Sequence, residues 1–268
     1  MIRLLTDEKS FDHELLLKTI SGKKMLSYLK AYGTEYDFCR FYEISNSSGR
    51  GFMFIINSTL IICSDENMTA DKELSLFVEM NLPFRIEGSQ NVLLGLKNMN
   101  SDRYQSLNRT VFELLPNDSP MDKCEEFVDF NPKLTDVYKI LSEGFPNIAD
   151  FELWYTDTSH RCRHGISRVF TYKNCTTASV MFDIADDILI GQVATKASSR
   201  GSGYAREFLR WMAGFLNKLG KKAYLLALDI RVSFYQEIGF REVEKEFVLE
   251  RIDIKKDSLL KGKLTDEQ

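Results

Sequence analysis

The sequence has few of the residues that build cross-linked or nucleic-acid-binding proteins. Its 268 residues include only 5 Cys, 5 Pro and 15 Gly. The cysteines are odd in number and never form a C-x-x-C pair, which argues against a disulfide framework or a zinc site and favours a reducing compartment. With 35 basic and 39 acidic side chains, the net charge of −4 provides no basic face for DNA or RNA. We therefore expect no nucleic-acid partner.

Long hydrophobic runs are also missing. No stretch approaches the roughly 18–20 apolar residues of a membrane span, and the opening residues MIRLLTDEKSFDHE are too acidic for a signal peptide. The 3 His do not cluster with the cysteines, so we expect no metal site. A content of 44% hydrophobic and 28% charged residues is typical of a globular protein with one large domain or two ordinary ones. These features predict a cytoplasmic protein without a membrane partner.

The best candidate for a linker is Pro116–Lys123 (PNDSPMDK), which combines two prolines with Asn and Asp. On either side of it the patterns occur in the same order: helix, three strands in hairpin order, helix, strand, helix and strand. We therefore predict an N-terminal α+β domain at residues 1–122, a second domain at 123–253 and a charged tail at 254–268. A repeated order of elements without repeated residues suggests an old duplication.

The second half holds the strongest patterns. Three strands are predicted at Gly165–Tyr172, Thr177–Ile184 and Ile188–Thr195. The predicted helix Gly203–Leu219 has apolar residues at i, i+3, i+4 and i+7, and a glycine follows it as a C-cap. The apolar run 223–228 (AYLLAL) is typical of a strand that is covered on both faces. This order predicts a central mixed, mostly antiparallel sheet with flanking helices.

The segment 193–205 (VATKASSRGSGYA) joins a predicted strand to the long helix. A helix N-terminus carries partial positive charge and unpaired N–H groups, so it binds phosphates. Gly201 and Gly203 let the backbone approach a ligand and adopt positive φ, and Arg200 adds a charge. A strand-to-helix turn without a ligand is the alternative. A P-loop is excluded, because no Lys-Ser or Lys-Thr follows the last glycine.

Two motifs in this half resemble those of the GNAT superfamily of N-acetyltransferases. Residues 200–205 (RGSGYA) fit its R/Q-x-x-G-x-G/A signature, and residues 233–240 (SFYQEIGF) resemble its F-Y-x-x-x-G-F segment. The two stand in the expected order, and the resemblance extends from Cys124 to Arg251. It implies an α+β, α/β/α-layered fold of the GNAT-like acyl-CoA N-acyltransferase type. The N-terminal half would be a tandem, degenerate copy of the same fold.

The resemblance implies acetyl-CoA (coenzyme A) as the cofactor and assigns residues to it. Val193, Ala194 and Thr195 would hold the pantetheine arm by sheet-like hydrogen bonds. The phosphates would bind at the following turn, which comprises Arg200, Gly201, Ser202, Gly203, Tyr204 and Ala205. Tyr235, the tyrosine of the second motif, would donate a proton to the departing thiolate. Packing in the core is the alternative role for Tyr235.

A general base that would deprotonate the amine is not evident. The family often places a carboxylate on its fourth strand, but residues 188–195 carry none. Gln192 could orient a water molecule but cannot itself be the base. Candidates nearby are Asp183, Asp186, Asp187, His164 and Glu152, each of which is more often a surface or turn residue.

The N-terminal half lacks a matching turn. Its corresponding connection, residues 63–73 (CSDENMTADKE), is acidic and free of glycine, so it would repel a pyrophosphate. We therefore expect this half to lack a cofactor site.

The sequence favours an enzyme that acetylates a primary amine of a small molecule or peptide by direct attack in a ternary complex. A catalytically silent acyl-CoA-binding or regulatory module and a scaffold without cofactor are the alternatives. The chain would be a monomer or a homodimer.

Overall fold

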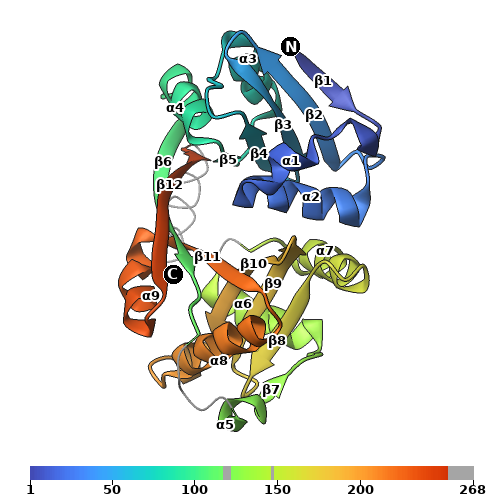
Figure 1. Ribbon diagram of the computed structural model, residues 1–268. Helices are drawn as coiled ribbons and strands as arrows, with labels where there is room; N and C mark the ends of the chain where they lie inside the picture. The colour runs from blue at the N-terminus through green and yellow to red at the C-terminus, as the bar shows by residue number, and fades with distance from the viewer. Residues whose placement is uncertain (117–121, 146–147, 253–268) are drawn as a thin grey trace, which may run out of the picture. The chain divides into compact units, whose positions relative to one another are not determined.

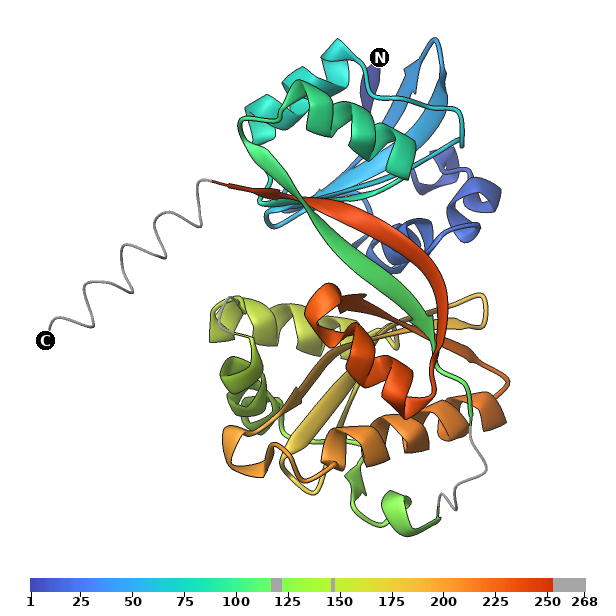
Figure 2. The same cartoon turned by 90° about the vertical axis from the view of Figure 1, so that its left-hand side faces the viewer.

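The computed structural model describes residues 1–116, 122–145 and 148–252, which form two compact units. Among these residues, one unit comprises Met1–Arg109 with Glu246 to Ile252, and the other comprises the part from Thr110 to Lys245. Residues 117–121 of the predicted linker and the predicted tail at 254–268 lie outside the described residues. Each unit contains a mixed β-sheet with helices on both faces (Figures 1 and 2).

The first unit places its sheet between two pairs of helices. Its strands are β1 (Ile2–Leu5), β2 (Cys39–Asn46), β3 (Gly49–Ile56), β4 (Thr59–Ser64), β5 (Arg85–Gly88), the start of β6 (Tyr104–Glu113) and the end of β12 (Arg241–Arg251). Its helical segments are η1 (Glu8–Ser10, a 3-10 turn), α1 (His13–Leu17), α2 (Ile20–Tyr32), α3 (Lys72–Asn81) and α4 (Gln90–Met99). The strand order is β1-β2-β3-β4-β5-β12-β6, with β4 parallel to β5. Helices α1 and α2 cover one face, and α3 and α4 cover the other (Figure 2).

The second unit is built in the same way. Its strands are β7 (Val128–Asp129), β8 (Arg168–Tyr172), β9 (Thr176–Ile184), β10 (Asp187–Thr195) and β11 (Lys222–Leu228). Its helical segments are α5 (Asp122–Glu125), α6 (Leu134–Gly144), α7 (Phe151–Arg163), η2 (Ala197–Ser199), α8 (Tyr204–Lys218), η3 (Asp229–Arg231) and α9 (Val232–Ile238). The end of β6 lies next to β11, and the order continues β10-β9-β8-β7. Strands β10 and β11 are parallel, and β7 to β10 pair antiparallel.

Both units have the same order of elements. A pair of helices precedes three antiparallel strands, a helix, a strand parallel to the third, a further helix and a long strand. In the first unit these are α1 and α2, β2 to β4, α3, β5, α4 and β6, and in the second α6 and α7, β8 to β10, α8, β11, α9 and β12. The predicted α+β class, with a mixed and mostly antiparallel sheet and flanking helices, is confirmed.

Two cores lie on opposite faces of the second sheet. Phe170 on β8 packs with Phe208 and Trp211 of α8, whereas its neighbour Val169 packs with Trp154 of α7. Successive side chains of a strand point to opposite faces, so each strand serves both cores. This explains why the strands of the second half have nearly continuous apolar patterns.

The sequence pattern predicts a helix near Ile148–Tyr155, but α7 continues to Arg163. Its second half, residues 156–163 (TDTSHRCR), is polar, and the apolar periodicity that predicts a helix is missing there. Thr158 and Arg161 are nevertheless buried against the sheet. The buried face of this half of the helix is therefore polar.

The predicted domain boundaries differ from the two units at the last strands. Strand β6 ends in the second unit, where the N–H of Leu114 donates to the carbonyl of Ala223 in β11 (2.8 Å). Strand β12 ends in the first unit, where Leu249 pairs with Ile86 of β5. Consecutive elements are usually adjacent in space, so the sequence analysis assigned each last strand to the domain of the elements that precede it. The local pattern of a strand indicates that it is paired but not which strand it pairs with.

A cluster of charged side chains is buried in the first unit. Glu87 on β5 is 4% exposed and accepts hydrogen bonds from Nζ of Lys24 on α2 (3.1 Å) and from Nη2 of Arg109 on β6 (3.3 Å). Arg109 also contacts Glu246 of β12. Burial raises the pKa of Glu87, but the charges of Lys24 and Arg109 outweigh it and hold the pKa below its usual range. The cluster therefore joins three strands and a helix through ionised groups.

We expect Glu87→Gln to lower the free energy of unfolding by about 3 kcal/mol, because it leaves the charge of Lys24 buried without its anion. The matched control is Glu43→Gln on β2, since Glu43 pairs with Arg3 (2.5 Å), whose side chain is 57% exposed. Its expected loss is about 1 kcal/mol or less. Urea denaturation measures both, and equal losses would contradict the role of the buried cluster.

Candidate functional site

The parallel strands β10 and β11 separate along their length. Their pairing ends at Ile190↔Leu225, although β10 continues to Thr195 and β11 to Leu228. On its other edge β10 stays paired with β9 as far as Thr195. Beyond Ile190, the edge of β10 that faces β11 therefore presents backbone N–H and C=O groups. An extended ligand can pair with such groups as another strand would.

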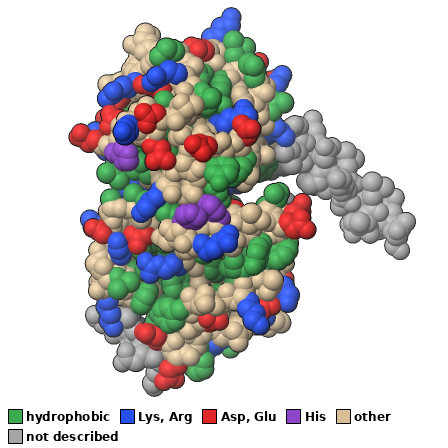
Figure 3. Space-filling model, turned by 90° about the vertical axis from the view of Figure 1, so that its right-hand side faces the viewer, with side chains coloured by type: hydrophobic (Ala, Val, Ile, Leu, Met, Phe, Trp, Pro, Cys, Tyr) green, Lys and Arg blue, Asp and Glu red, His purple; other side chains and the backbone are tan. Residues whose placement is uncertain are grey.

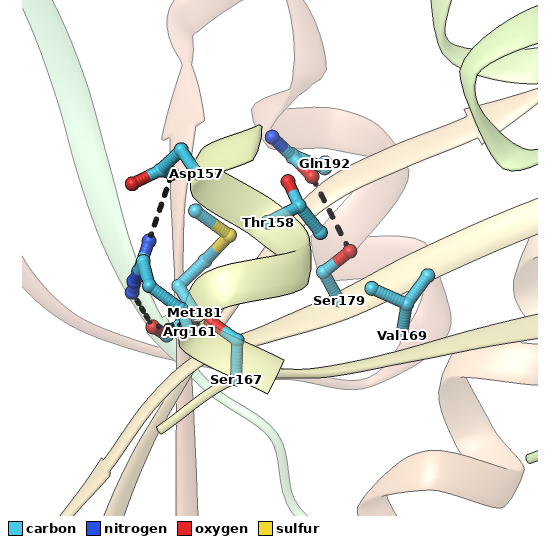
Figure 4. Close-up of a pocket in the computed structure, with 8 residues that line it drawn as sticks. All are labelled: Asp157, Thr158, Arg161, Ser167, Val169, Ser179, Met181 and Gln192. Atoms are coloured by element: carbon cyan, nitrogen blue, oxygen red, sulfur yellow. Dashed lines mark hydrogen bonds and ion pairs between the residues drawn. The ribbon is translucent and has the colours of Figure 1, made fainter. Parts of the chain in front are cut away.

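A β-bulge lies where the two strands part. The register of β10 against β9 shifts between Gly191 and Ala194, and Gln192 has a left-handed φ of 53°. That conformation is costly for a residue with a Cβ atom. A Cβ at residue 191 would lie 2.8 Å from Cγ of Met181, so a larger residue than glycine would force that side chain to shift. The Gln192 side chain lies on the face covered by α7, where its Oε1 accepts a hydrogen bond from Oγ of Ser179 (3.3 Å; Figure 4).

The chain after β10 leads through η2 into the first turn of α8. Gly201 and Gly203 have φ of 81° and 80°, and a Cβ at either position would meet nothing within 4 Å. The backbone conformation, not lack of space, is therefore what favours glycine. Gly203 is the N-cap of α8 and has no side chain to accept from the N–H groups of the first turn. Free N–H groups at the positive end of a helix dipole are suited to bind an anion.

Arg200 fixes this turn. Its Nε donates to the carbonyl oxygen of Thr195 (3.1 Å), and its Nη2 donates to that of Glu143 at the end of α6 (2.5 Å). The carboxylate of Glu143 accepts from the N–H of Ala197 (2.5 Å). The guanidinium is exposed and carries five N–H donors, so it retains donors for an anion.

Tyr235 lies on α9 in an aromatic cluster, with its ring centre 5.6 Å from that of Phe112. Helix α9 lies beside α8, since Nη2 of Arg206 on α8 pairs with Glu237 on α9 (2.9 Å). Burial raises the pKa of the Tyr235 hydroxyl, and the opposing effect of the Arg231 charge is smaller. The phenol is therefore protonated at neutral pH and able to donate.

The second unit contains both groups of predicted site residues. Val193, Tyr204 and Tyr235 pack against the core under α8 and α9. Ala194 packs into the core under α6 and α7, and the Thr195 hydroxyl lies 3.0 Å from that of Thr176. In the turn, Gly201, Ser202 and Gly203 are exposed and Ala205 is half-buried.

The aspartates considered as a general base lie away from the open end of β10. Asp183 lies near the end of β9 and Asp186 in the turn that follows, and both pair with Nζ of Lys221 (2.9 Å each). Asp187 is the first residue of β10, in its paired part. At about 3.3 Å per residue it lies roughly 16 Å from Gln192.

His164 and Glu152 lie at the surface of α7. The imidazole of His164 stacks on that of His160 with ring centres 4.1 Å apart, and its Nδ1 lies 2.9 Å from the His160 carbonyl oxygen. Glu152 is exposed in the first turn of the helix. Histidine side chains, purple in Figure 3, are visible at the molecular surface. A small polar cavity lies beside Gln192, and neither His164 nor Glu152 lines it.

That polar cavity lies between α7 and the sheet, and the sequence analysis missed it (Figure 4). Its volume is about 10 Å³. It is lined by Asp157, Thr158, Arg161, Ser167, Val169, Ser179, Met181 and Gln192. The sequence did contain one indication of this polar helix face, the spacing of Thr158 and Arg161, since residues at i and i+3 share one helix face.

In the first unit the corresponding strands, β4 and β5, do not separate in this way. Strands β4 and β5 remain paired as far as Ile62, and the N–H of Ser89 then donates to the Ile62 carbonyl (3.1 Å). Oγ of Ser89 accepts from the N–H of Ser64 (2.9 Å). The carboxylate of Asp71 caps α3 by accepting from the N–H of Leu74 (2.9 Å). Backbone groups that β10 and α8 leave open are thus occupied here.

Comparison with solved structures identifies the fold. A GCN5-related N-acetyltransferase from Sphaerobacter thermophilus superposes with a TM-score of 0.60 at 14% identity, over 94% of this chain and 95% of that one. The chain has the GNAT fold. A GCN5-related N-acetyltransferase from Kribbella flavida superposes on this GNAT-fold chain with a TM-score of 0.55 at 11% identity, over 87% of this chain and 96% of that one. A Drosophila protein superposes with a TM-score of 0.57 at 11% identity, over 94% of this chain and 98% of that one.

No family model matches the sequence, and no curated protein matches it. Within the described parts of this GNAT-fold chain, no helix is long and apolar enough to cross a membrane. Over the same residues, no group of three or more His, Cys, Asp or Glu side chains is arranged to hold a metal ion.

We expect Tyr235 to ionise above the ordinary tyrosine value of about 10, because burial raises its pKa. The alkaline absorbance titration of the wild type minus that of Tyr235→Phe isolates this phenol among the 11 tyrosines. A difference curve with its midpoint at or below pH 10 would show that the hydroxyl is not in a desolvated site.

Proposed function

We propose that the second unit transfers an acetyl group from acetyl-CoA to a primary amine of a small molecule or peptide. One observation carries this proposal: the open edge of β10 is followed, after the short turn η2, by the uncapped N-terminus of α8. The amides of a pantetheine arm need backbone partners, and a diphosphate needs N–H donors in a positive potential. Residues 193–195 and 200–205 offer these two kinds of group in that order along the chain.

The chemistry needs a proton donor for the leaving sulfur. A thiol ordinarily has a pKa of about 8.5, so a donor beside the departing thiolate helps without being indispensable. Tyr235 fits this role, because its hydroxyl is protonated and α9 lies beside the helix that would hold the phosphates. Neither motif contains a cysteine, which favours direct attack by the amine in a ternary complex over an acyl-enzyme.

The acceptor must also lose a proton. An amine with an ordinary pKa of about 10.4 is mostly protonated at pH 7, which costs roughly 4–5 kcal/mol. A base or a route for the proton is therefore part of the proposed activity.

The first unit, in this proposal, binds no coenzyme. Its β4 and β5 remain paired, and Asp71 already occupies the N-terminus of α3. A bound diphosphate would meet the Asp71 carboxylate at the place where α8 has only Gly203.

Acetyl-CoA should bind the wild type saturably, and Arg200→Glu should weaken its Kd by at least about tenfold, since the change repels a phosphate and removes the bonds to Thr195 and Glu143. Isothermal titration calorimetry measures both. The control Arg168→Glu makes the same change of charge at the start of β8, on an exposed side chain paired with Asp183 (3.5 Å). Equal weakening by both variants would mean that total charge, not this turn, sets the affinity.

Tyr235→Phe should lower kcat about 10²-fold while leaving the Kd for acetyl-CoA nearly unchanged, because it removes a proton donor but keeps the ring. The assay follows thiol release from acetyl-CoA with a panel of primary amines. The control Tyr155→Phe changes an exposed tyrosine of α7 and should leave kcat near the wild-type value. A parallel loss of turnover and affinity in Tyr235→Phe would assign the tyrosine to packing. Acetyl-CoA binding without thiol release from any amine would favour a silent coenzyme-binding module.

A further inference from the structure

The end of α6 and the segment that leads to α8 satisfy each other's backbone groups. The last turn of a helix leaves carbonyl groups without intrahelical partners, and the first turn leaves N–H groups without them. Nη2 of Arg200 donates to one such carbonyl of α6, that of Glu143 (2.5 Å). The Glu143 carboxylate accepts from the N–H of Ala197, the first residue of η2 (2.5 Å). Glu143 therefore contacts both ends of the segment from Ala197 to Arg200.

The next residue of α6, Gly144, packs closely on β10. A Cβ at Gly144 would lie 2.9 Å from Cβ of Ala194, so a side chain there would push the helix and the strand apart. Ala194 is buried in the core under α6 and α7, and it lies in the part of β10 beyond its pairing with β11. The end of α6 thus contacts both the open strand segment and the turn that follows it.

The charge of Glu143 opposes the ligand of the proposed function. Glu143 is an exposed carboxylate beside the turn that would hold the phosphates of coenzyme A. Like charges repel, so this carboxylate weakens the binding of an anion unless it contributes something larger. What it contributes is a fixed geometry, because it orders the backbone at Ala197 while its carbonyl oxygen orients Arg200. A turn that is ordered beforehand loses less conformational entropy when a phosphate binds.

The first unit secures the corresponding connection from another element. After β4, the N–H of Thr69 donates to Oγ of Ser48 (2.9 Å), and Nδ2 of Asn46 donates to the Thr69 carbonyl (2.9 Å). Asn46 and Ser48 lie at the turn between β2 and β3. Neutral side chains therefore order this connection in the unit for which no coenzyme is proposed, so the GNAT fold does not demand a carboxylate for that purpose.

We propose that Glu143 is a positioning residue for the coenzyme, which acts through Ala197 and Arg200 without touching the ligand. The inference rests on the proposed acetyl transfer. The turn needs the side-chain oxygen of Glu143 and not its charge, because the N–H of Ala197 requires an acceptor. A glutamine oxygen can replace that acceptor, whereas an alanine methyl group cannot. Repulsion alone would instead make binding tighter with any neutral residue at position 143.

The test is isothermal titration calorimetry of the full chain with acetyl-CoA. Glu143→Gln keeps an acceptor and removes the charge, so its Kd should equal that of the wild type or be lower by up to about fivefold. Glu143→Ala removes both, and its Kd should rise about tenfold, as expected for a lost hydrogen bond to a charged group. If Glu143→Ala binds as tightly as Glu143→Gln or more tightly, Glu143 only repels the coenzyme and the proposal is wrong.

The matched control is Asp129→Ala. It also removes an exposed carboxylate that accepts from a backbone N–H, that of Asn131 (2.9 Å). Asp129 lies on β7, which β8 and β9 separate from β10. The Kd of this variant for acetyl-CoA should stay near the wild-type value, and a rise equal to that of Glu143→Ala would contradict a specific role of Glu143.

Steady-state kinetics separate positioning from a general loss of structure. With the primary amine that gives the fastest thiol release, Glu143→Ala should raise the KM for acetyl-CoA about tenfold and leave kcat within about twofold of the wild type. The reason is that the variant leaves Tyr235 and its surroundings unchanged. A fall in kcat at an unchanged KM would overturn the proposal.

Amide hydrogen exchange tests the contact without a ligand. The N–H of Ala197 should exchange at least about tenfold faster in Glu143→Ala than in the wild type or Glu143→Gln. Equal exchange in all three overturns the proposal. Should Glu143→Ala fail to fold, Glu143→Asp replaces it, since that carboxylate is one methylene too short to reach Ala197. An unchanged Kd and unchanged exchange in Glu143→Asp then overturn the proposal.

The outcomes separate this inference from the proposed function. If the wild type binds acetyl-CoA and releases thiol but Glu143→Ala and Glu143→Gln bind equally, positioning by Glu143 is wrong and acetyl transfer stands. If the wild type neither binds acetyl-CoA nor releases thiol with any amine, both are wrong. A Kd that rises in Glu143→Ala but not in Glu143→Gln, with kcat retained, supports the positioning role.

Discussion

The separation of β10 from β11 is the constraint on which the candidate site depends. Parallel strands satisfy each other's backbone groups, so a pair that parts at Ile190 leaves polar groups that need another partner. The bulge at Gln192 bends β10 at this point, and β9 holds its other edge in place as far as Thr195. The position of the turn and of the α8 N-terminus then follows from where the strand ends.

The first unit shows how the same architecture looks without such a separation. Its β4 and β5 stay paired, Ser89 extends the pairing, and Asp71 supplies the oxygen that the N-terminus of α3 needs. Charged side chains of β5, β6 and β12 fill its interior around Glu87. A fold therefore does not by itself specify a site, because small changes in strand pairing and helix capping decide whether backbone groups are available.

The second half of α7 turns a polar face toward the sheet. Thr158 and Arg161 are buried where a helix normally places apolar residues, and they lie opposite Ser179 and Gln192 of the sheet. Buried polar groups are costly unless they bond to one another or to water. Here the hydroxyl of Ser179 donates to Gln192, and Arg161 pairs with Asp157, so these groups have partners inside the protein.

Much of the second half was predictable from local patterns. The strands and the long amphipathic helix, the glycine turn from Arg200 to Ala205 and the segment with Tyr235 all give signals within a few residues, because helix and strand periods and turn glycines are local properties. Helix α7 was predicted too short, since its buried face is polar and breaks the apolar period. The aspartates suggested as a base were near in sequence but lie by the turn between β9 and β10, at the paired end of β10.

The sequence by itself determined the fold class, the order of the elements and the residues of the two motifs. Only the tertiary structure decided where β10 and β11 part, which strands receive the ends of β6 and β12, and that Gln192 lies beside Ser179 under α7. The reason is that periodicity and turn chemistry act between neighbours in the chain. The pairing of distant strands and the packing of a helix on a sheet depend on residues far apart in the sequence, and no local pattern records which of them meet.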